Sequence, residues 1–251
     1  MKISELIAAK SNFEDNTKWL PFSVHARDTA GIINRLFNKW IAENVRRRLC
    51  AAIGIESSGN AEAIVCNYCE FIALVHDIGK LTPAFQRKLK DNIQGLADRL
   101  LDAGIDLSDL TQISESPHNI AGQYILKKEF KVAPSTAVIV GAHHGDCSAD
   151  MKQCAYDANY YGHGKVNVNE WTQIRAKWME YALSVTGFED VKNLPNPDIA
   201  AQMLITGLLV MSDWIASNTD YFPYIDIEEK LTDEQCEERV RRAWNKLSLT
   251  D

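Results

Sequence analysis

The sequence has no run of about 18 apolar residues, the length that predicts a membrane-spanning helix. Residues 1–15 carry acidic side chains where a secretory signal would have an apolar stretch. Both absences favour a soluble, cytoplasmic protein. Internal repeats, low-complexity segments and an evident linker are also missing, so we expect one domain over residues 1–251.

Cysteine is sparse, with six residues scattered along the chain, which is too few for a disulfide scaffold at this length. Cys66 and Cys69 form a CxxC pair, but a structural zinc site needs a second pair at matching spacing, and the sequence has none. Because their spacing fits the inward side of a helix, burial is the simpler interpretation.

Excess positive charge is also absent, since 34 acidic residues outnumber 27 lysines and arginines and the formal net charge is −7. Affinity for nucleic acid usually comes from a basic face, so this charge argues against extensive binding of nucleic acid by the surface. A nuclease is still possible, because bound divalent cations would reverse the sign locally. The basic clusters at 46–48, 127–131 and 239–242 are more typical of solvated helix faces than of a DNA track.

No convincing run of alternating strand residues occurs, and the apolar periodicity is helical almost throughout, which predicts an all-α bundle. A first helix is predicted from residue 21 to about 53, with Ser23 as its N-cap. A second is predicted over 60–76, with Gly79 as its C-terminal stop.

Further helix boundaries follow from proline and glycine. Thr82-Pro83 and Ser116-Pro117 each predict an N-cap followed by proline at the first helical position. Gly145 predicts the end of the segment that carries His143-His144, and more helices are expected at about 170–186 and 232–247. A further helix is predicted from Pro197. Residues spaced by three and four along it would share one face, which places Asp213 among mainly apolar residues: Ile199, Met203, Thr206, Val210, Asp213 and Ser217.

One long irregular segment is predicted at about 146–169, rich in tyrosine and directly after His143-His144. Loops of this length are usually functional or disordered. Tyr160 and Tyr161, with Tyr156 nearby, are candidates for stacking on nucleic-acid bases, an interaction worth about 1 to 3 kcal/mol per base. Packing of these rings onto the bundle is an equally good interpretation.

Five of the six histidines form an ordered series with two aspartates. Imidazole and carboxylate hold catalytic transition metals, and seven such ligands suffice for two adjacent ions with positions left open for water. A lone inward histidine is more often a hydrogen-bonded core residue than a ligand. Five such histidines together with an inward aspartate are much harder to explain as core residues. We therefore predict a metallohydrolase site formed by His25, His76, Asp77, His118, His143, His144 and Asp213.

The segment ALVHDIGK at 73–80, with an upstream histidine and a downstream aspartate, resembles the HD superfamily of metal-dependent phosphohydrolases. His118, the segment GAHHGD at 141–146 and the segment SDWIAS at 212–217 make the resemblance more particular. Together these motifs are similar to the HD nuclease domain of CRISPR-associated protein 3, the nuclease-helicase of type I interference systems. The resemblance extends from His25 to about Ser217.

This resemblance implies a division of the ligands between two ions. One ion would be held by His25, His76, Asp77 and Asp213, and the other by His118, His143 and His144 with Asp77 bridging. It also implies cleavage of single-stranded DNA with Mn, Fe, Ni or Co, and a helicase and the RNA-guided surveillance complex as partners. The sequence has no GxxxxGK[ST] motif, so we expect no helicase motor in this chain.

The reaction expected is two-metal hydrolysis of a phosphodiester, with Asp77 fixing the distance between the ions. Lys80 is either a surface lysine or a group that neutralises charge developing in the transition state. Ser217 and Asn218, one turn beyond Asp213, are candidates for phosphate contacts, with packing at the helix end as the alternative.

Two other functions stay open at this point. The same ligand set would serve an HD phosphohydrolase that acts on a nucleotide or another small phosphate ester. A non-catalytic binding module with structural metals is less favoured, because structural zinc sites are closed and seldom use this many residues.

Overall fold

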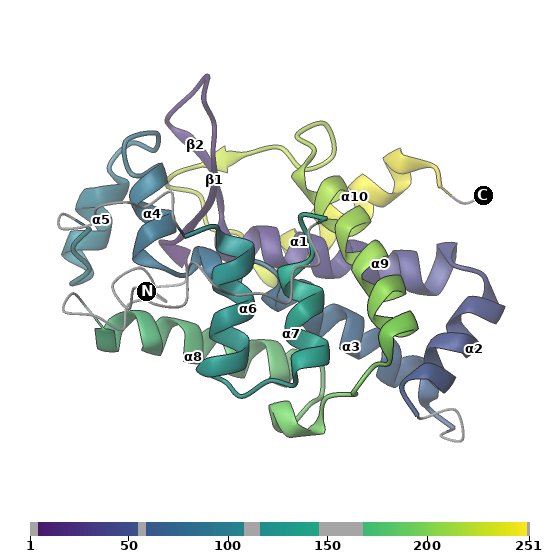
Figure 1. Cartoon of the computed structure of the whole chain (residues 1–251). Helices are drawn as coiled ribbons and strands as arrows, with labels where there is room; N and C mark the ends of the chain where they lie inside the picture. The colour runs from purple at the N-terminus through teal and green to yellow at the C-terminus, as the bar shows by residue number, and fades with distance from the viewer. Residues whose placement is uncertain (1–4, 55–58, 108–115, 146–167, 250–251) are drawn as a thin grey trace.

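The structure, a computed structural model, describes residues 5–54, 59–107, 116–145 and 168–249. It is mostly helical, as predicted, with a small sheet that was not predicted (Figure 1). The α-helices are α1 (Phe22–Arg35), α2 (Glu43–Ala52), α3 (Ala61–Val75), α4 (Pro83–Leu89), α5 (Leu96–Asp102), α6 (His118–Lys128), α7 (Pro134–Gly141), α8 (Val168–Val185), α9 (Ile199–Ser217) and α10 (Asp233–Leu247). Shorter elements are the π-helical turn η2 (Leu36–Trp40), the 3-10 turns η3 (Ile78–Lys80) and η5 (Val191–Asn193), and strands β1 (Ala8–Ser11), β2 (Lys18–Pro21) and β3 (Ile225–Asp226).

Helix α1 is the centre of the fold. It packs against α3, α9 and α10, while α6 and α7 pack against each other and α7 also contacts α9 (Figure 1). Its inward face mixes the apolar residues Ile32 and Ile33 with the buried polar residues His25 and Asp28. Asp28 is paired there with Arg239 of α10, whose Nη2 lies 3.0 Å from Asp28 Oδ2. Such a partner offsets the cost of burying the Asp28 charge. His25 faces a different group of polar residues, described below.

The single helix predicted over 21–53 is wrong in two respects. The chain leaves α1 through η2, where the Ile41 amide donates to the Leu36 carbonyl five residues back, and residues 41 and 42 are extended before α2 begins. Apolar spacing stays helical on both sides of this short break, so periodicity does not reveal it. Ser23 is not the N-cap, because α1 already starts at Phe22 and Pro21 occupies the cap position.

Most other helix boundaries fall where they were predicted. Helix α3 begins after Asn60 and ends before His76, and Thr82 caps α4 by accepting a hydrogen bond from the Phe85 amide. Ser116 lies one residue too early to cap α6, whose cap position is Pro117. Cys66 and Cys69 are buried on α3 with free thiols, as expected.

The sheet is antiparallel with strand order β1-β2-β3. Its strands contain only two to four residues each, too short to show an alternating pattern in the sequence. The pairs Ala8↔Pro21 and Lys10↔Leu20 leave Ala9 as an extra residue in β1. The sheet therefore contains a bulge at the strand that lies against α4.

Helix α9 buries a different face from the one predicted. Ile199 and Met203 are 75% and 72% exposed. The buried side is formed by Ala201, Ile205, Leu208, Leu209, Ser212 and Ala216. By length and composition alone α9 could cross a membrane, but it packs against α1 and α7 and brings Asp213 to His25, so it is here a helix of the bundle.

The irregular segment predicted at 146–169 lies outside the described residues, except for its last two, with which α8 begins. Tyr156, Tyr160 and Tyr161 are within the undescribed part, and their predicted role stays a prediction.

Candidate metal centre

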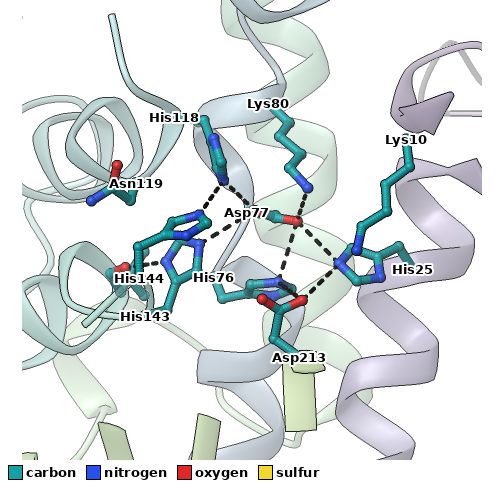
Figure 2. A network of polar contacts seen from close by, with 12 residues as sticks. Lys10, His25, His76, Asp77, Lys80, His118, Asn119, His143, His144 and Asp213 are labelled. Atoms are coloured by element: carbon teal, nitrogen blue, oxygen red, sulfur yellow. Dashed lines mark hydrogen bonds and ion pairs between the residues drawn. The ribbon is translucent and has the colours of Figure 1, made fainter. Parts of the chain in front are cut away.

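The seven predicted ligands come from five separate segments and meet at one place (Figure 2). His25 lies in the first turn of α1, His76 and Asp77 follow the end of α3, and Asp213 lies in the last part of α9. His118 is the first residue of α6, and His143 and His144 follow α7. The convergence of helix ends and one helix face at a shared centre is how helical bundles commonly place metal ligands.

Asp77 is the central residue, and its Oδ2 atom faces the first group of side chains. Oδ2 lies 3.2 Å from His25 Nε2 and 3.3 Å from His76 Nε2. Asp213 closes this group, with its Oδ1 atom 3.1 Å from His25 Nε2 and 3.6 Å from His76 Nε2. Two imidazoles and two carboxylates therefore surround one point.

The other carboxylate oxygen of Asp77 faces a second group. Oδ1 lies 3.3 Å from His118 Nε2 and 3.6 Å from His143 Nε2. His144 joins this group through its Nε2 atom, 2.9 Å from His118 Nε2. Asp77 thus stands between a His/Asp group and a three-histidine group, with one oxygen directed at each.

Backbone contacts orient two of the imidazoles. His76 Nδ1 donates to the Ala73 carbonyl at 2.7 Å, and His143 Nδ1 donates to the Val140 carbonyl at 2.6 Å. Each carbonyl lies three residues back, at the end of the helix that the histidine follows. A proton held on Nδ1 leaves Nε2 to face the centre, which is the arrangement that second-shell hydrogen bonds give to metal-binding histidines.

Four of the seven residues are buried, yet several of their polar atoms lack hydrogen-bond partners. His25, His76, Asp77 and His143 are at most 1% exposed. Their inward atoms approach one another without hydrogen-bond geometry, and a buried polar group left unsatisfied costs about 1–3 kcal/mol. Among the described residues, the atoms here without a hydrogen-bond partner are His25 Nδ1 and Nε2, His76 Nε2, Asp77 Oδ1 and Oδ2, and His143 Nε2. Of these, Asp77 Oδ2 forms an ion pair with Lys80.

Coordination of cations would satisfy these atoms. Nitrogen and carboxylate oxygen donors suit first-row divalent transition metals. Two groups present ligand atoms that all lie within 4.8 Å of one another, namely His25, His76 and Asp77, and His118, His143 and His144. The residues therefore fit two ions, with the Asp77 carboxylate between them.

The charges of the centre are strongly coupled. Burial opposes ionisation of Asp77, but His76 and Lys80 outweigh it and hold its pKa well below the usual range. Burial likewise opposes the protonated form of His76, but Asp77 and Asp213 raise its pKa to about 10. For His118 burial prevails over Asp77 and lowers the pKa to about 4, so this imidazole is neutral at pH 7. The raised pKa of His76 belongs to the metal-free centre, and this imidazole must lose a proton when a metal binds.

Lys80 is not a surface lysine. It is 5% exposed, and its Nζ atom lies 2.6 Å from Asp77 Oδ2. Its ammonium group also lies over the Phe85 ring, 5.3 Å from the ring centroid, and that ring packs edge-on against His118. Lys80 therefore places a positive charge beside the carboxylate that joins the two groups.

The two candidates for phosphate contacts lie in different surroundings. Ser217 donates to Asp213 Oδ1 at 3.0 Å and lies at the edge of the centre. Asn218 is exposed, and its Oδ1 atom accepts from the Asp220 amide at 2.8 Å. No contact among the described residues joins Asn218 to the seven ligands.

Three residues near the centre were missed in the sequence. Lys10 of β1 donates from Nζ to Ser217 Oγ, and Gln86 of α4 contacts the backbones of Ala8 and Lys80. Asn119 donates to the Gly141 carbonyl at 3.0 Å and so joins the start of α6 to the end of α7. None of these residues belongs to a spaced motif, so only the fold reveals them.

Comparison with known proteins decides the family. A family model described as Cas3, HD domain, matches residues 9–222. A CRISPR-associated nuclease/helicase Cas3 of Streptococcus thermophilus is 36% identical over 233 residues, which are 86% of this chain and 25% of that protein. The chain belongs to the Cas3 HD-domain family. The resemblance carried by the motifs at 73–80, 141–146 and 212–217, to an HD nuclease domain of CRISPR interference, is confirmed at the level of the family.

Solved structures show the same fold. A CRISPR-associated protein superposes with a TM-score of 0.77 at 24% identity, over 98% of this chain and 27% of its own. The Cas3 HD domain of Thermus thermophilus, solved in the presence of Ni²⁺, gives 0.55 at 19% identity, over 98% of this chain and 91% of its own. The Cas3 HD fold is therefore common to them, while this chain spans about a quarter of the length of the curated Cas3 relative.

Proposed function

We propose that this domain is a two-metal nuclease that hydrolyses phosphodiester bonds of single-stranded DNA in type I CRISPR interference. The observation that supports this most is the position of Asp77, whose two oxygens face two separate ligand groups. A carboxylate so placed suits a bridge between two ions, which is the arrangement of two-metal phosphodiesterases.

In this proposal, His25, His76, Asp77 and Asp213 hold one ion, and His118, His143, His144 and Asp77 hold the other. Mn, Fe, Ni and Co are the expected metals, in keeping with the nitrogen-rich ligand set and with the Ni²⁺ named for the Thermus thermophilus domain. Bound divalent ions supply a low-pKa water and screen the charge of a phosphate group.

The chain's own residues set the conditions for that chemistry. Asp213 stays ionised because hydrogen bonds from His25 and His76 outweigh the cost of its burial, and Asp77 because His76 and Lys80 do so. His118 stays neutral at pH 7 because its burial disfavours the charged form. Lys80 holds Asp77 in place and offers positive charge to an incoming phosphate.

Substrate contacts are proposed from Ser217, Asn218, Tyr160 and Tyr161. Ser217 lies beside Asp213, and its hydroxyl would donate to a phosphate oxygen in place of Asp213 when substrate binds. Asn218 follows it at the end of α9. Tyr160 and Tyr161 are proposed from the sequence as a stacking surface for bases. Stacking needs no basic patch, so it suits a protein whose net charge is −7.

The proposed partners are a helicase and the RNA-guided surveillance complex, and the proposed location is the cytoplasm. The relative from Streptococcus thermophilus is a nuclease/helicase, and this chain matches 25% of it. A motor that delivers an unwound strand would complement a domain whose sequence has no P-loop motif.

The test compares substrates under identical conditions. Purified protein is loaded with Mn, Ni or Co and incubated with single-stranded DNA, RNA, a panel of nucleotides and a chromogenic phosphodiester. Cleavage of single-stranded DNA that Asp77→Asn abolishes is the expected result. Hydrolysis confined to nucleotides would replace the nuclease with a small-molecule phosphohydrolase, and inactivity of metal-loaded protein on every substrate would favour a non-catalytic module.

A further inference from the structure

Lys10 reaches the metal centre from β1, a strand that precedes all seven proposed ligands in the sequence. The bulge at Ala9 pairs Lys10 with Leu20, where a regular register would pair Ala9 with Leu20. Because side chains alternate between the two faces of a strand, this one-residue shift changes the face to which Lys10 belongs. The side chain then points towards the centre (Figure 2). There it donates a hydrogen bond to Ser217, at the edge of the centre.

The position of β1 is fixed to the turn that carries Lys80. Gln86 is fully buried, accepts from the Ala8 amide at 3.0 Å and donates to the Ala8 carbonyl at 2.9 Å. The same side-chain nitrogen donates to the Lys80 carbonyl at 2.9 Å. Gln86 therefore fixes the backbone of β1, which carries Lys10, relative to the turn that carries Lys80. The side chains of Lys10 and Lys80 enter the centre from the same side (Figure 2).

The Lys10 ammonium group is only partly satisfied. It carries three N–H donors, and its one hydrogen-bond partner among the described residues is the neutral hydroxyl of Ser217. The side chain is half-buried, so it has left part of its hydration behind. Burial and the neighbouring charge of Lys80 lower its pKa, while Asp213 and Asp77 oppose this.

Lys10 differs from Lys80 in how many of its N–H donors have a partner. Lys80 is committed to the Asp77 carboxylate, 2.6 Å away, whereas Lys10 has donors to spare. With two divalent ions bound, the carboxylates of the centre would be engaged by metal, and Lys10 would face a surplus of positive charge. An anionic oxygen from the substrate is the group that would satisfy it.

We propose that Lys10 is a phosphate-binding residue of this centre, which donates from Nζ to a non-bridging oxygen of a backbone phosphate of the DNA strand. The inference rests on the proposed nuclease function, and it assigns to the N-terminal strand a direct part in holding the substrate. Ser217 then serves as the second point that holds the ammonium group in place.

Lys10→Met tests the proposal, because it removes the charge and keeps the length of the side chain. Lys18→Met is the matched control, since Lys18 is an exposed lysine on β2 of the same sheet. Lys10→Arg keeps the charge. For each variant, the affinity for a fluorescent oligothymidylate is measured by anisotropy over a range of salt concentrations, together with KM and kcat for cleavage, metal content and melting temperature.

For Lys10→Met we expect the affinity for the oligonucleotide to fall and KM to rise about 10-fold, the effect of losing one charge-assisted hydrogen bond. The slope of log affinity against log salt should flatten by about 0.7, the contribution of one phosphate contact on a single strand. Metal content and melting temperature should match wild type, Lys10→Arg should recover most of the affinity, and Lys18→Met should change neither slope nor KM.

An unchanged salt slope and KM in Lys10→Met would overturn the proposal. So would a loss of metal or stability with the slope preserved, since that would make Lys10 a counter-charge for Asp213. Lys10→Gln removes the charge but keeps a hydrogen-bond donor on the side chain. The same results are expected for it, and it replaces the methionine variant if that one is unstable. Wild-type protein that cleaves no nucleic acid would instead refute the nuclease function, whereas active wild type with an unaltered Lys10→Met variant would refute only the role of Lys10.

Discussion

Gly79 lies so close to His118 that a Cβ atom on residue 79 would be 1.9 Å from the His118 carbonyl oxygen. The same atom would be 2.7 Å from the Gly122 amide nitrogen. Because Gly79 has no side chain, α6 can begin against η3, the turn that follows α3. His118 Nε2 then lies 3.3 Å from Asp77 Oδ1. Gly79 was predicted to end the preceding helix, but α3 ends at Val75 and the glycine is needed for close packing.

Gly79→Ala should consequently displace α6 from η3. Because the clash is with backbone and no flexible side chain can yield, we expect a loss of about 1–3 kcal/mol in the free energy of unfolding. The three-histidine group should also lose affinity for metal. Urea denaturation and metal analysis would measure both effects.

Gly207→Ala is the matched control, because Gly207 lies within α9 and an added Cβ would meet nothing within 4 Å. Alanine is the better helix former by about 1 kcal/mol, so this variant should be as stable as wild type or more so. Equal effects of the two substitutions would refute the packing role of Gly79.

How far the sequence predicted the centre depends on the kind of residue. The proposed ligands were found because histidines are few and recur at helix ends, and because a buried carboxylate such as Asp213 needs a partner. Lys10 and Gln86 act through backbone contacts and a bulge, which leave no pattern in residue type. Ile199 and Met203 were predicted on the buried face of α9 but are exposed. Helix α9 is apolar on most sides, so periodicity alone does not indicate which face is buried.

The two-sided position of Asp77 predicts different effects for two metal-site variants. Asp77→Asn keeps the shape of the side chain but removes the charge that faces both ligand groups, so both ions should be lost or weakened and hydrolysis abolished. His144→Ala removes a more exposed ligand of the three-histidine group alone. Titration with Mn or Ni followed by metal analysis should show two weakened sites in the first variant and one in the second. Wild-type activity in Asp77→Asn would contradict the two-metal proposal.

Removal of metal should lower the melting temperature without unfolding the protein. Ligands that bind the folded state stabilise it by mass action, so a chelator removes that contribution. The apolar core, to which α1, α3 and α9 contribute, contains none of the proposed ligands. Circular dichroism at room temperature should therefore keep its helical signal in the presence of chelator, and loss of that signal would show that the metals are structural.

The metal-free protein should also become less stable at alkaline pH. The pKa of His76 is about 10 in the folded protein, because Asp77 and Asp213 outweigh burial, against an ordinary value of 6.5. A group with a raised folded pKa contributes stability that is full below pH 6.5 and is lost as the pH rises towards about 10. The melting temperature of chelated protein should fall across this window, and that of chelated His76→Gln should fall less. If the two proteins decline in parallel, another group is responsible.

Gln86 provides the test of how the N-terminal strand is held. Its amide group makes three hydrogen bonds, two with Ala8 and one with Lys80, all of them in the protein interior. Gln86→Leu has nearly the same volume but leaves those backbone groups without partners, at a cost of about 1–3 kcal/mol.

Since both lysine-bearing segments would then move, KM for single-stranded DNA should rise in Gln86→Leu while metal content stays close to wild type. Gln202→Leu is the control, because the one hydrogen bond of the Gln202 side chain among the described residues is to the nearby Pro197 carbonyl, just before α9. Denaturation curves and KM values for the two variants separate a general loss of stability from a specific loss of substrate binding. A Gln86→Leu protein that is destabilised but binds DNA as tightly as wild type would show that the strand needs no such attachment to place Lys10.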